Sequence, residues 1–525
     1  MQGEPWENKV CSNTRREFLG NVGRGMLLAG LGTTLSTELG LATAEAADAP
    51  QALTFGELEP LVALMQDTEP VKLTAILVEK LKSGTSLKTM VAAGALANAR
   101  TFGGQDYVGF HTFMALAPAY TMSQQLPLEL QPLPVLKVLY RNADRIQEFG
   151  GRANETLRSI VAEPIPDGAA PGEYLRDLSR TGDIEKADRT FASLSNAPVG
   201  EAFNHLQFAV EDEVDVHRVV LAWRAWDTLD LAGQEWANCL LRQSIRYCAS
   251  REKDILDRGG TRSSIRTVLP ALLDQYDLLE TPLGDKSGDD TWLNELATTM
   301  FRGTRDEAAA AVAQSLRAGY SPECIGEAMS LAANMLVLHD PGRPDKWANA
   351  DKPVGSCHGD SIGVHASDAA NAWRNIARVS NPRNTVASLI VGGYHTAGAS
   401  QYSNAQPYPL PEHLAEVTTT DAAGLLREAE EAIRAKDQFR AAATMARYGE
   451  LGHDARPAFD LMLKFATSED GALHAEKYYR TATAEFDAMR SSVRWGQVTA
   501  LARVTASEYG HLSPGYQAAK QVLGT

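Results

Sequence analysis

The chain has 525 residues, of which 44% are hydrophobic and 22% charged, and its formal net charge is −16. Such a composition is typical of a globular protein, and the length allows roughly two to four domains. The negative charge argues against nucleic acid or an anionic membrane as a partner.

Residues 1–46 are typical of a twin-arginine export signal. Arg15 and Arg16 precede an apolar residue and a leucine, a moderately apolar run follows, and small residues close the segment. That run is too short and mild for a stable membrane span, and no other run approaches the roughly 20 residues that a span needs. We therefore expect the twin-arginine export machinery as a partner and a periplasmic or otherwise exported mature protein. The alternative is a disordered basic N-terminus without a targeting role.

The rest of the chain predicts an all-α fold. Apolar residues recur at spacings of three and four, and alternating strand patterns are nearly absent. Segments rich in Pro, Gly, Asp and Asn predict loops at 164–172, 281–290, 340–360 and 399–413. The loop at 340–360 is a long insertion, and long loops of this kind often carry function.

Two parts of the sequence resemble each other, which indicates an internal repeat. DYVGFHTFMALAPA at 106–119 and DSIGVHASDAANAW at 360–373 share an Asp, a Gly, a His and an Ala at matching positions. Three flanking pairs follow the same order, namely 57–67 with 267–277, 81–99 with 316–334, and 232–252 with 451–470. We therefore predict two diverged copies of one helical unit, at 47–264 and 265–525.

Each copy carries similar helix signals. Gly84 and Gly319 are expected to end one helix in a left-handed conformation, and the serine two residues after each is expected to cap the next helix. Asp106 and Asp360 then precede a Gly and a His near the start of a further helix, where a carboxylate suits the N-terminus.

The repeated histidines, His111 and His365, are the first candidates for catalysis. A single histidine is more often structural. If the two copies pack about a pseudo-twofold axis, however, equivalent residues near that axis would converge on one pocket. Imidazoles there could ligate iron, zinc or haem, or act as general acid and base near neutral pH. The sequence leaves these alternatives open.

Three further histidines are candidate metal ligands. His205 and His217 each follow a glutamate by four residues and would share a helix face with it if those segments are helical. The signal is weak because di-iron proteins use a spacing of three. His358 lies next to a glycine in the long insertion. The candidate metal ligands are therefore His111, His205, His217, His358 and His365.

Arginine and tryptophan residues gather at 217–246. Arg224 and Trp226 could bind an anionic or planar aromatic substrate. The alternative is an ordinary amphipathic helix pair with Arg–Asp ion pairs.

Common catalytic motifs are absent from the sequence. It contains no CxxC, GxSxG, Walker A, Rossmann or HExxH pattern. This excludes thioredoxin-like chemistry, covalent haem c and the corresponding hydrolase, nucleotide-binding and zincin classes. The absence of a close cysteine run also argues against iron–sulfur clusters.

Some segments resemble the questin oxidase-like family of helical proteins. FHTFMALAPAY at 110–120 and VHASDAANAWR at 364–374 resemble two histidine helices of that family, and LPVLKVLYRNADRIQ at 133–147 resembles its Leu-Tyr-Arg-Asn segment. The resemblance covers a minor part of the chain and implies Baeyer–Villiger-type oxygenation of polyketide-like aromatics, with His111 and His365 as candidates.

The segments at 81–99 and 316–334 also resemble the helical fold of the carboxymuconolactone decarboxylase and AhpD-like proteins. The chain lacks the redox CxxC of that fold, which puts peroxidase chemistry in doubt.

Together these observations predict an exported, internally duplicated all-α protein. As an enzyme it would be an oxidoreductase that acts on a small organic molecule through a histidine-lined pocket between the repeats, with or without a metal. The alternative is a non-catalytic helical scaffold or ligand-binding protein whose histidines are structural. The sequence does not decide between the two and does not identify a cofactor.

Overall fold

The computed structural model describes residues 51–399 and 403–524. Every regular element within these ranges is a helix, and the only extended pairings there are three isolated β-bridges. The predicted all-α fold is therefore confirmed for this part of the chain. The predicted export signal at residues 1–46 lies outside it. None of the described helices combines the length and the hydrophobicity that crossing a bilayer requires.

The chain divides into two compact units, which we describe separately. Unit 1 comprises the described residues up to 213, residues 217–263 and the end of the chain from 518, and unit 2 comprises residues 214–216 and 264–517. The main division, between 263 and 264, lies next to the boundary that the repeat predicts. Internal duplication itself stays a prediction.

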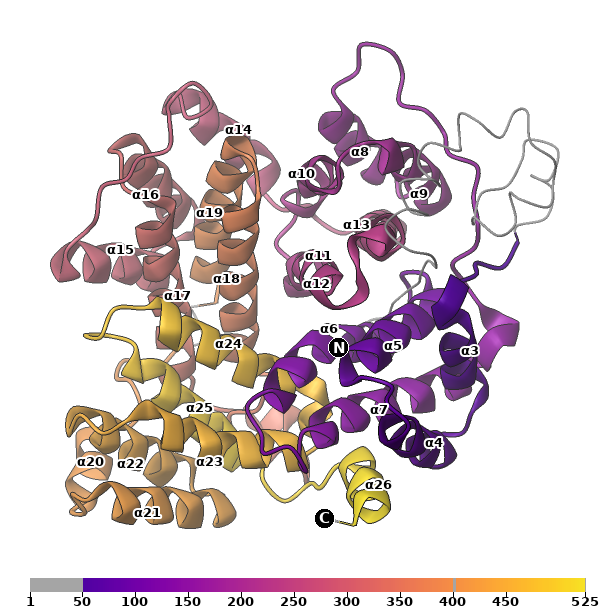
Figure 1. The fold of residues 1–525 in the computed structure, drawn as a ribbon. Helices are drawn as coiled ribbons and strands as arrows, with labels where there is room; N and C mark the ends of the chain where they lie inside the picture. The colour runs from indigo at the N-terminus through magenta and orange to yellow at the C-terminus, as the bar shows by residue number, and fades with distance from the viewer. Residues whose placement is uncertain (1–50, 400–402, 525) are drawn as a thin grey trace. The chain divides into compact units, whose positions relative to one another are not determined.

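Unit 1 consists of two groups of helices, α3–α7 and α8–α13 (Figure 1). Their bounds are α3 Glu59–Asp67, α4 Pro70–Lys82, α5 Leu87–Phe102, α6 Tyr107–Ser123, α7 Pro132–Phe149, α8 Pro171–Ser179, α9 Ile184–Ser193, α10 Val199–Val210, α11 Val216–Asp227, α12 Leu229–Ala232 and α13 Ala237–Asp257.

The core of the first group is formed by α5 and α6. Residues 90–102 of α5 and 109–119 of α6 are all buried. Helices that are apolar on every side lie in the interior of a protein, and α5 contacts α3, α6 and α7. His111 is therefore held on one of the most enclosed helices of unit 1.

Unit 2 also consists of two groups, α14–α19 and α20–α25 (Figure 1). Their bounds are α14 Ile265–Gln275, α15 Asp290–Arg302, α16 Arg305–Arg317, α17 Pro322–Leu338, α18 Ile362–Val379, α19 Pro382–Ala397, α20 Pro411–Glu416, α21 Ala422–Arg434, α22 Gln438–Glu450, α23 Ala455–Ser468, α24 His474–Ala488 and α25 Trp495–Glu508. A final helix, α26 (Pro514–Leu523), is assigned to unit 2 up to residue 517 and to unit 1 from residue 518.

The two groups of unit 2 meet where α18 contacts α24 and α17 contacts α25. At the start of α18, Gly363 allows a close approach to α17, because a Cβ atom there would lie only 2.7 Å from the Cα of Val337. The first turn of α18 thus packs closely against the last turn of α17. This contact fixes both ends of the long insertion.

The predicted helix signals are largely confirmed. Gly84 and Gly319 have φ angles of +102° and +82°, in the left-handed region that favours glycine. Ser86 accepts a hydrogen bond from the backbone of Thr89 at 3.0 Å. Ser321 caps α17 in the same way. These side chains satisfy backbone N–H groups that have no partner within the helix.

The two repeated aspartates differ. Asp106 caps α6 through the backbone N–H of Gly109, as predicted. Asp360 does not cap α18, because Ser361 takes that position. The Asp360 carboxylate instead pairs with Arg343 at 2.5 Å and with Lys352 at 2.8 Å. The insertion supplies both cations, so it redirects the aspartate from a helix cap to an ion pair.

Candidate functional site

The strongest candidate site in unit 2 is a pair of histidines. His365, in the second turn of α18, faces His474, the first residue of α24. The Nε2 atoms are 3.3 Å apart and the ring centroids 5.3 Å. His474 is only 3% exposed, whereas His365 is half-buried. The pair therefore has one enclosed imidazole and one that is partly accessible.

A left-handed turn places His474 at the start of α24. Gly471, Ala472 and Leu473 have φ angles of +48°, +46° and +66°. Residues with a Cβ atom rarely adopt this conformation, because the Cβ approaches the following carbonyl oxygen. Leu473 is buried at 2% exposure, and its packing holds the turn in place. Strain of this kind is often found at functional sites.

Replacing the exposed Ala472 by glycine is expected to stabilise the protein by about 0.5–1 kcal/mol, because glycine adopts the left-handed conformation without the Cβ clash. Urea denaturation would measure the change. The control is Ala484→Gly within α24, which should destabilise by about 1 kcal/mol through lost helix propensity. Equal destabilisation by both variants would contradict a strained turn at Ala472.

The end of the insertion covers this histidine pair. The backbone N–H of Cys357 donates to Ser507 Oγ at 3.1 Å, and that of Gly359 donates to Glu508 Oε1 at 2.8 Å. Both acceptors lie at the end of α25. A Cβ atom at Gly359 would collide with the side chain of His474. Glycine is therefore required there for the loop to lie against the histidine.

His358, predicted as a metal ligand, lies in this covering loop. It is 3% exposed, and its Nε2 has no hydrogen-bond partner in the described residues. Burial lowers the pKa of His358 to about 4, and the positive charges of Lys352 and Arg343 lower it further than Asp360 raises it. Neutral imidazole is therefore the stable form at physiological pH.

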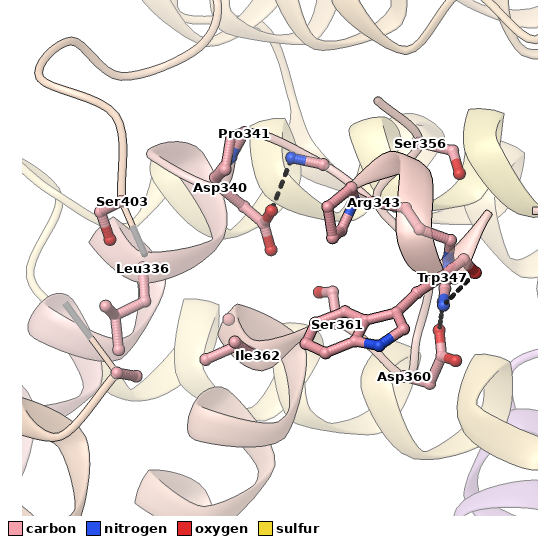
Figure 2. A pocket seen from close by; sticks show the side chains of 14 residues that line it. Leu336, Asp340, Pro341, Arg343, Trp347, Ser356, Asp360, Ser361, Ile362 and Ser403 are labelled. Carbon is pink, nitrogen blue, oxygen red and sulfur yellow. Dashed lines mark hydrogen bonds and ion pairs between the residues drawn. The ribbon is translucent and has the colours of Figure 1, made fainter. Parts of the chain in front are cut away.

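A cavity of about 220 Å³ lies at the start of α18 (Figure 2). Its apolar walls include Leu336, Trp347 and Ile362, and its polar atoms include those of Asp340 and Arg343. The start of α18 contributes Ile362, Gly363 and the preceding cap residue Ser361 to the lining, which includes neither His365 nor His474. The histidine pair is therefore not part of the cavity wall.

Unit 1 holds a second histidine pair, inside an aromatic cluster. The rings of His111 and His217 have centroids 5.2 Å apart, and Phe110 lies 4.3 Å from the first and 4.6 Å from the second. The Nδ1 of His111 lies 2.8 Å from the carbonyl oxygen of Tyr107, one helical turn earlier. His111 is 3% exposed. The sequence predicted both histidines as candidates but not their proximity.

The two predicted Glu–His pairs have different outcomes. Both residues of the first pair lie on α10, where His205 Nε2 is 3.7 Å from Glu201 Oε1. The second pair does not lie on one helix, because α11 begins only at Val216 and Glu213 lies before it. Glu213 accepts a hydrogen bond from the backbone of Ser263 at 3.0 Å.

The predicted substrate contacts lie on α11. Arg224 is 3% exposed and pairs with Asp227 at 2.8 Å. Trp226 packs against Phe203, with ring centroids 4.5 Å apart. These contacts agree with the structural alternative of an Arg–Asp tie on an amphipathic helix, and the substrate role stays a prediction.

Metal binding finds no support in the described residues. They contain no group of three or more His, Cys, Asp or Glu side chains arranged to hold a metal ion. Zinc sites use more than two protein ligands, so neither histidine pair fits such an ion by itself. Binding of iron, zinc or haem stays a prediction of the sequence.

His365 and His111 belong to different units, so the pocket predicted between the repeats stays a prediction. No family model, curated protein or solved structure was found to match the chain. Function is therefore inferred from the geometry within each unit.

Proposed function

We propose that unit 2 exchanges protons with a small organic molecule through the pair His365 and His474. The observation that carries this proposal is the 3.3 Å separation between their Nε2 atoms. At that distance one Nε2 donates its proton and the other accepts through its lone pair, since a neutral imidazole has one N–H and one acceptor nitrogen. The contact therefore holds one proton between two basic nitrogens.

This arrangement supports both directions of proton transfer. If His365 takes a proton from the bound molecule at Nδ1, its Nε2 proton can pass to Nε2 of His474. The positive charge is then shared between the two rings. The reverse transfer returns a proton to the product. The pair can thus act as general base and then as general acid near neutral pH.

The choice between His365 and His111 as the reacting histidine follows from accessibility. His365 is half-buried, whereas His111 is 3% exposed. The oxidoreductase class and the export of the protein stay predictions of the sequence. The alternative of a non-catalytic scaffold is supported by the same contact, because two histidines can simply satisfy each other, and an experiment must separate the two.

The test uses 5-nitrobenzisoxazole, a small aromatic compound that opens when a base removes its carbon-bound proton. Its phenolate product is followed by absorption at neutral pH. We expect the wild-type protein to accelerate this elimination and His365→Gln to abolish the acceleration. His474→Gln should reduce the rate by roughly 10²-fold or more, as general-base contributions do. His453→Gln, a histidine of α22's C-terminal loop in the same unit, is the matched control.

Two results would overturn the proposal. One is a wild-type rate no higher than that of His365→Gln, which leaves the scaffold as the working model. The other is a rate lost equally in His453→Gln, which would assign the activity to surface imidazoles rather than to the pair.

A further inference from the structure

The cavity at the start of α18 is built by the insertion between α17 and α18. The insertion closes on itself, because the backbone N–H of Arg343 donates to Ser356 at 2.9 Å and that of Gly355 donates back to Arg343 at 2.9 Å. Arg503, which is fully buried, donates to the carbonyl oxygens of Val337 at 2.8 Å and Asp340 at 2.7 Å. These bonds fix the loop, so the cavity is preformed.

The walls of the cavity suit a ring-sized molecule. A buried apolar cavity of about 150 Å³ is known to bind benzene, and this one has a volume of about 220 Å³. Leu336 and Ile362 form apolar walls, and the Trp347 indole is 50% exposed. Figure 2 shows this indole reaching across the cavity toward Ser361 and Ile362. Lys346 Nζ lies over this indole, 4.2 Å from the ring centroid, and the other face of the ring can stack on a planar ligand.

The charge that a ligand would meet comes from Asp340. Its Oδ1 accepts a hydrogen bond from the backbone N–H of Gly342 at 2.7 Å. No described residue donates to its Oδ2, and Figure 2 shows that oxygen turned toward the middle of the cavity. Carboxylate oxygens normally accept hydrogen bonds, so Oδ2 is an available acceptor.

The guanidinium group of Arg343, next to Asp340, is not available to bind an anionic ligand. Arg343 donates to Asp360 at 2.5 Å and to the carbonyl oxygen of Trp347 at 3.5 Å. Its remaining nitrogen, Nε, is buried. Lys352 also pairs with Asp360, at 2.8 Å. The carboxylate of Asp340 is thus the charged group that can pair with a ligand. The net charge of −16 also favours the approach of cations.

We infer that this cavity binds small aromatic cations, with the charged nitrogen on Asp340 and the ring against Trp347. An ammonium or protonated heterocycle donates to Oδ2, and its ring fills the space between the indole and the wall formed by Leu336 and Ile362. The inference is independent of the proposed proton transfer, because neither His365 nor His474 lines the cavity.

Calorimetric titration with benzylammonium at pH 7.5 tests the inference, with benzoate and benzyl alcohol as probes of the same size. We expect benzylammonium to bind the full-length protein more tightly than either probe. Asp340→Asn keeps the acceptor for Gly342 and should weaken benzylammonium binding about tenfold, as expected for a hydrogen bond to a charged group. Asp345→Asn, an equal change of charge on the same loop outside the cavity lining, should leave binding unchanged. Trp347→Ala should weaken all three probes.

Other results overturn the inference. Tighter binding of benzoate would assign the cavity to anions. Equal weakening by Asp340→Asn and Asp345→Asn would mean that the overall charge of the loop attracts the probe. Absence of binding for all three probes would mean that the cavity is not a ligand site. Each result leaves the elimination assay of the histidine pair unaffected.

Discussion

Replacing Asp188 by asparagine is expected to lower the free energy of unfolding of unit 1 by about 3–5 kcal/mol, the usual cost of breaking a buried ion pair. Asp188 lies on α9 and is fully buried. Its Oδ1 accepts from Arg242 at 2.6 Å, and its Oδ2 accepts from Arg246 at 2.8 Å. Burial alone would raise the pKa of Asp188, but the two guanidinium groups outweigh it and hold the pKa below its ordinary value.

The large loss of stability is expected because asparagine leaves two buried arginines without their shared carboxylate. Arg242 and Arg246 lie one turn apart on α13 and are each 3% exposed. Without the carboxylate, the one charged partner that Arg246 keeps among the described residues is the exposed Glu185, and Arg242 keeps a carbonyl oxygen. A buried charge without a counter-charge is much more costly than a lost surface contact.

Guanidinium chloride denaturation, followed by helix content, would measure the loss. The control is Glu185→Gln on the same helix, which removes an exposed partner of Arg246 and should change stability by less than about 1 kcal/mol. A loss below that value for Asp188→Asn would contradict the predicted role of this ion pair. The triple variant Asp188→Leu, Arg242→Met, Arg246→Leu should recover part of the stability, because apolar side chains of similar size can replace a buried ionic cluster.

The helices and their ends could be predicted from the sequence because they depend on local chemistry. Apolar spacing, the glycines Gly84 and Gly319 and the serines that follow them act within a few residues. The loop at 340–360 was also predicted from its composition. Asp360 shows where local reasoning fails, because its partners Arg343 and Lys352 come from the folded loop rather than from the helix that it precedes.

The candidate site was predicted only in part. His365 followed from the repeat, but its partner His474 did not, because the aligned segment at 451–470 ends just before it. The contact between them joins residues 109 positions apart and depends on how α18 packs against α24. The left-handed turn before His474 is equally unexpected, since Ala472 and Leu473 carry no local preference for it. Contacts of this kind follow from tertiary packing.

The second large effect concerns pH. Lowering the pH from 7.5 to 5 is expected to cost unit 2 about 2 kcal/mol of stability through His358 alone. The pKa of this histidine is about 4 in the folded protein, mainly because it is buried, against an ordinary value of 6.5. Between these two values the unfolded chain binds a proton that the folded chain does not. Stability therefore falls as the pH falls through 6.5 and continues to fall until about pH 4.

In the variant His358→Gln, the unfolding free energy should fall less steeply between pH 7.5 and pH 5. The comparison uses the difference in unfolding free energy between pH 7.5 and pH 5, so that any cost of the substitution itself cancels. The pKa of His339 is also lowered by burial, so His339 also makes the protein less stable as the pH falls. The variant should therefore keep a smaller dependence of the unfolding free energy on pH. Asp360 and Glu323 contribute little in this range, because their ordinary pKa values of 3.8 and 4.5 already lie below pH 5, and their folded pKa values, lowered by salt bridges, are about 2.

The outcome separates a buried neutral histidine from one that takes up a proton in the folded protein. If His358→Gln and wild type lose the same unfolding free energy between pH 7.5 and 5, His358 is protonated as readily in the folded chain as in the unfolded one. The prediction that the loop over His474 shields His358 from water would then be wrong. A smaller loss in the variant, with His453→Gln behaving as wild type, confirms that the loop excludes water from His358. Because that loop is tied to Ser507 and Glu508 and packs against His474, acid should then loosen the cover of the histidine pair before it unfolds the unit.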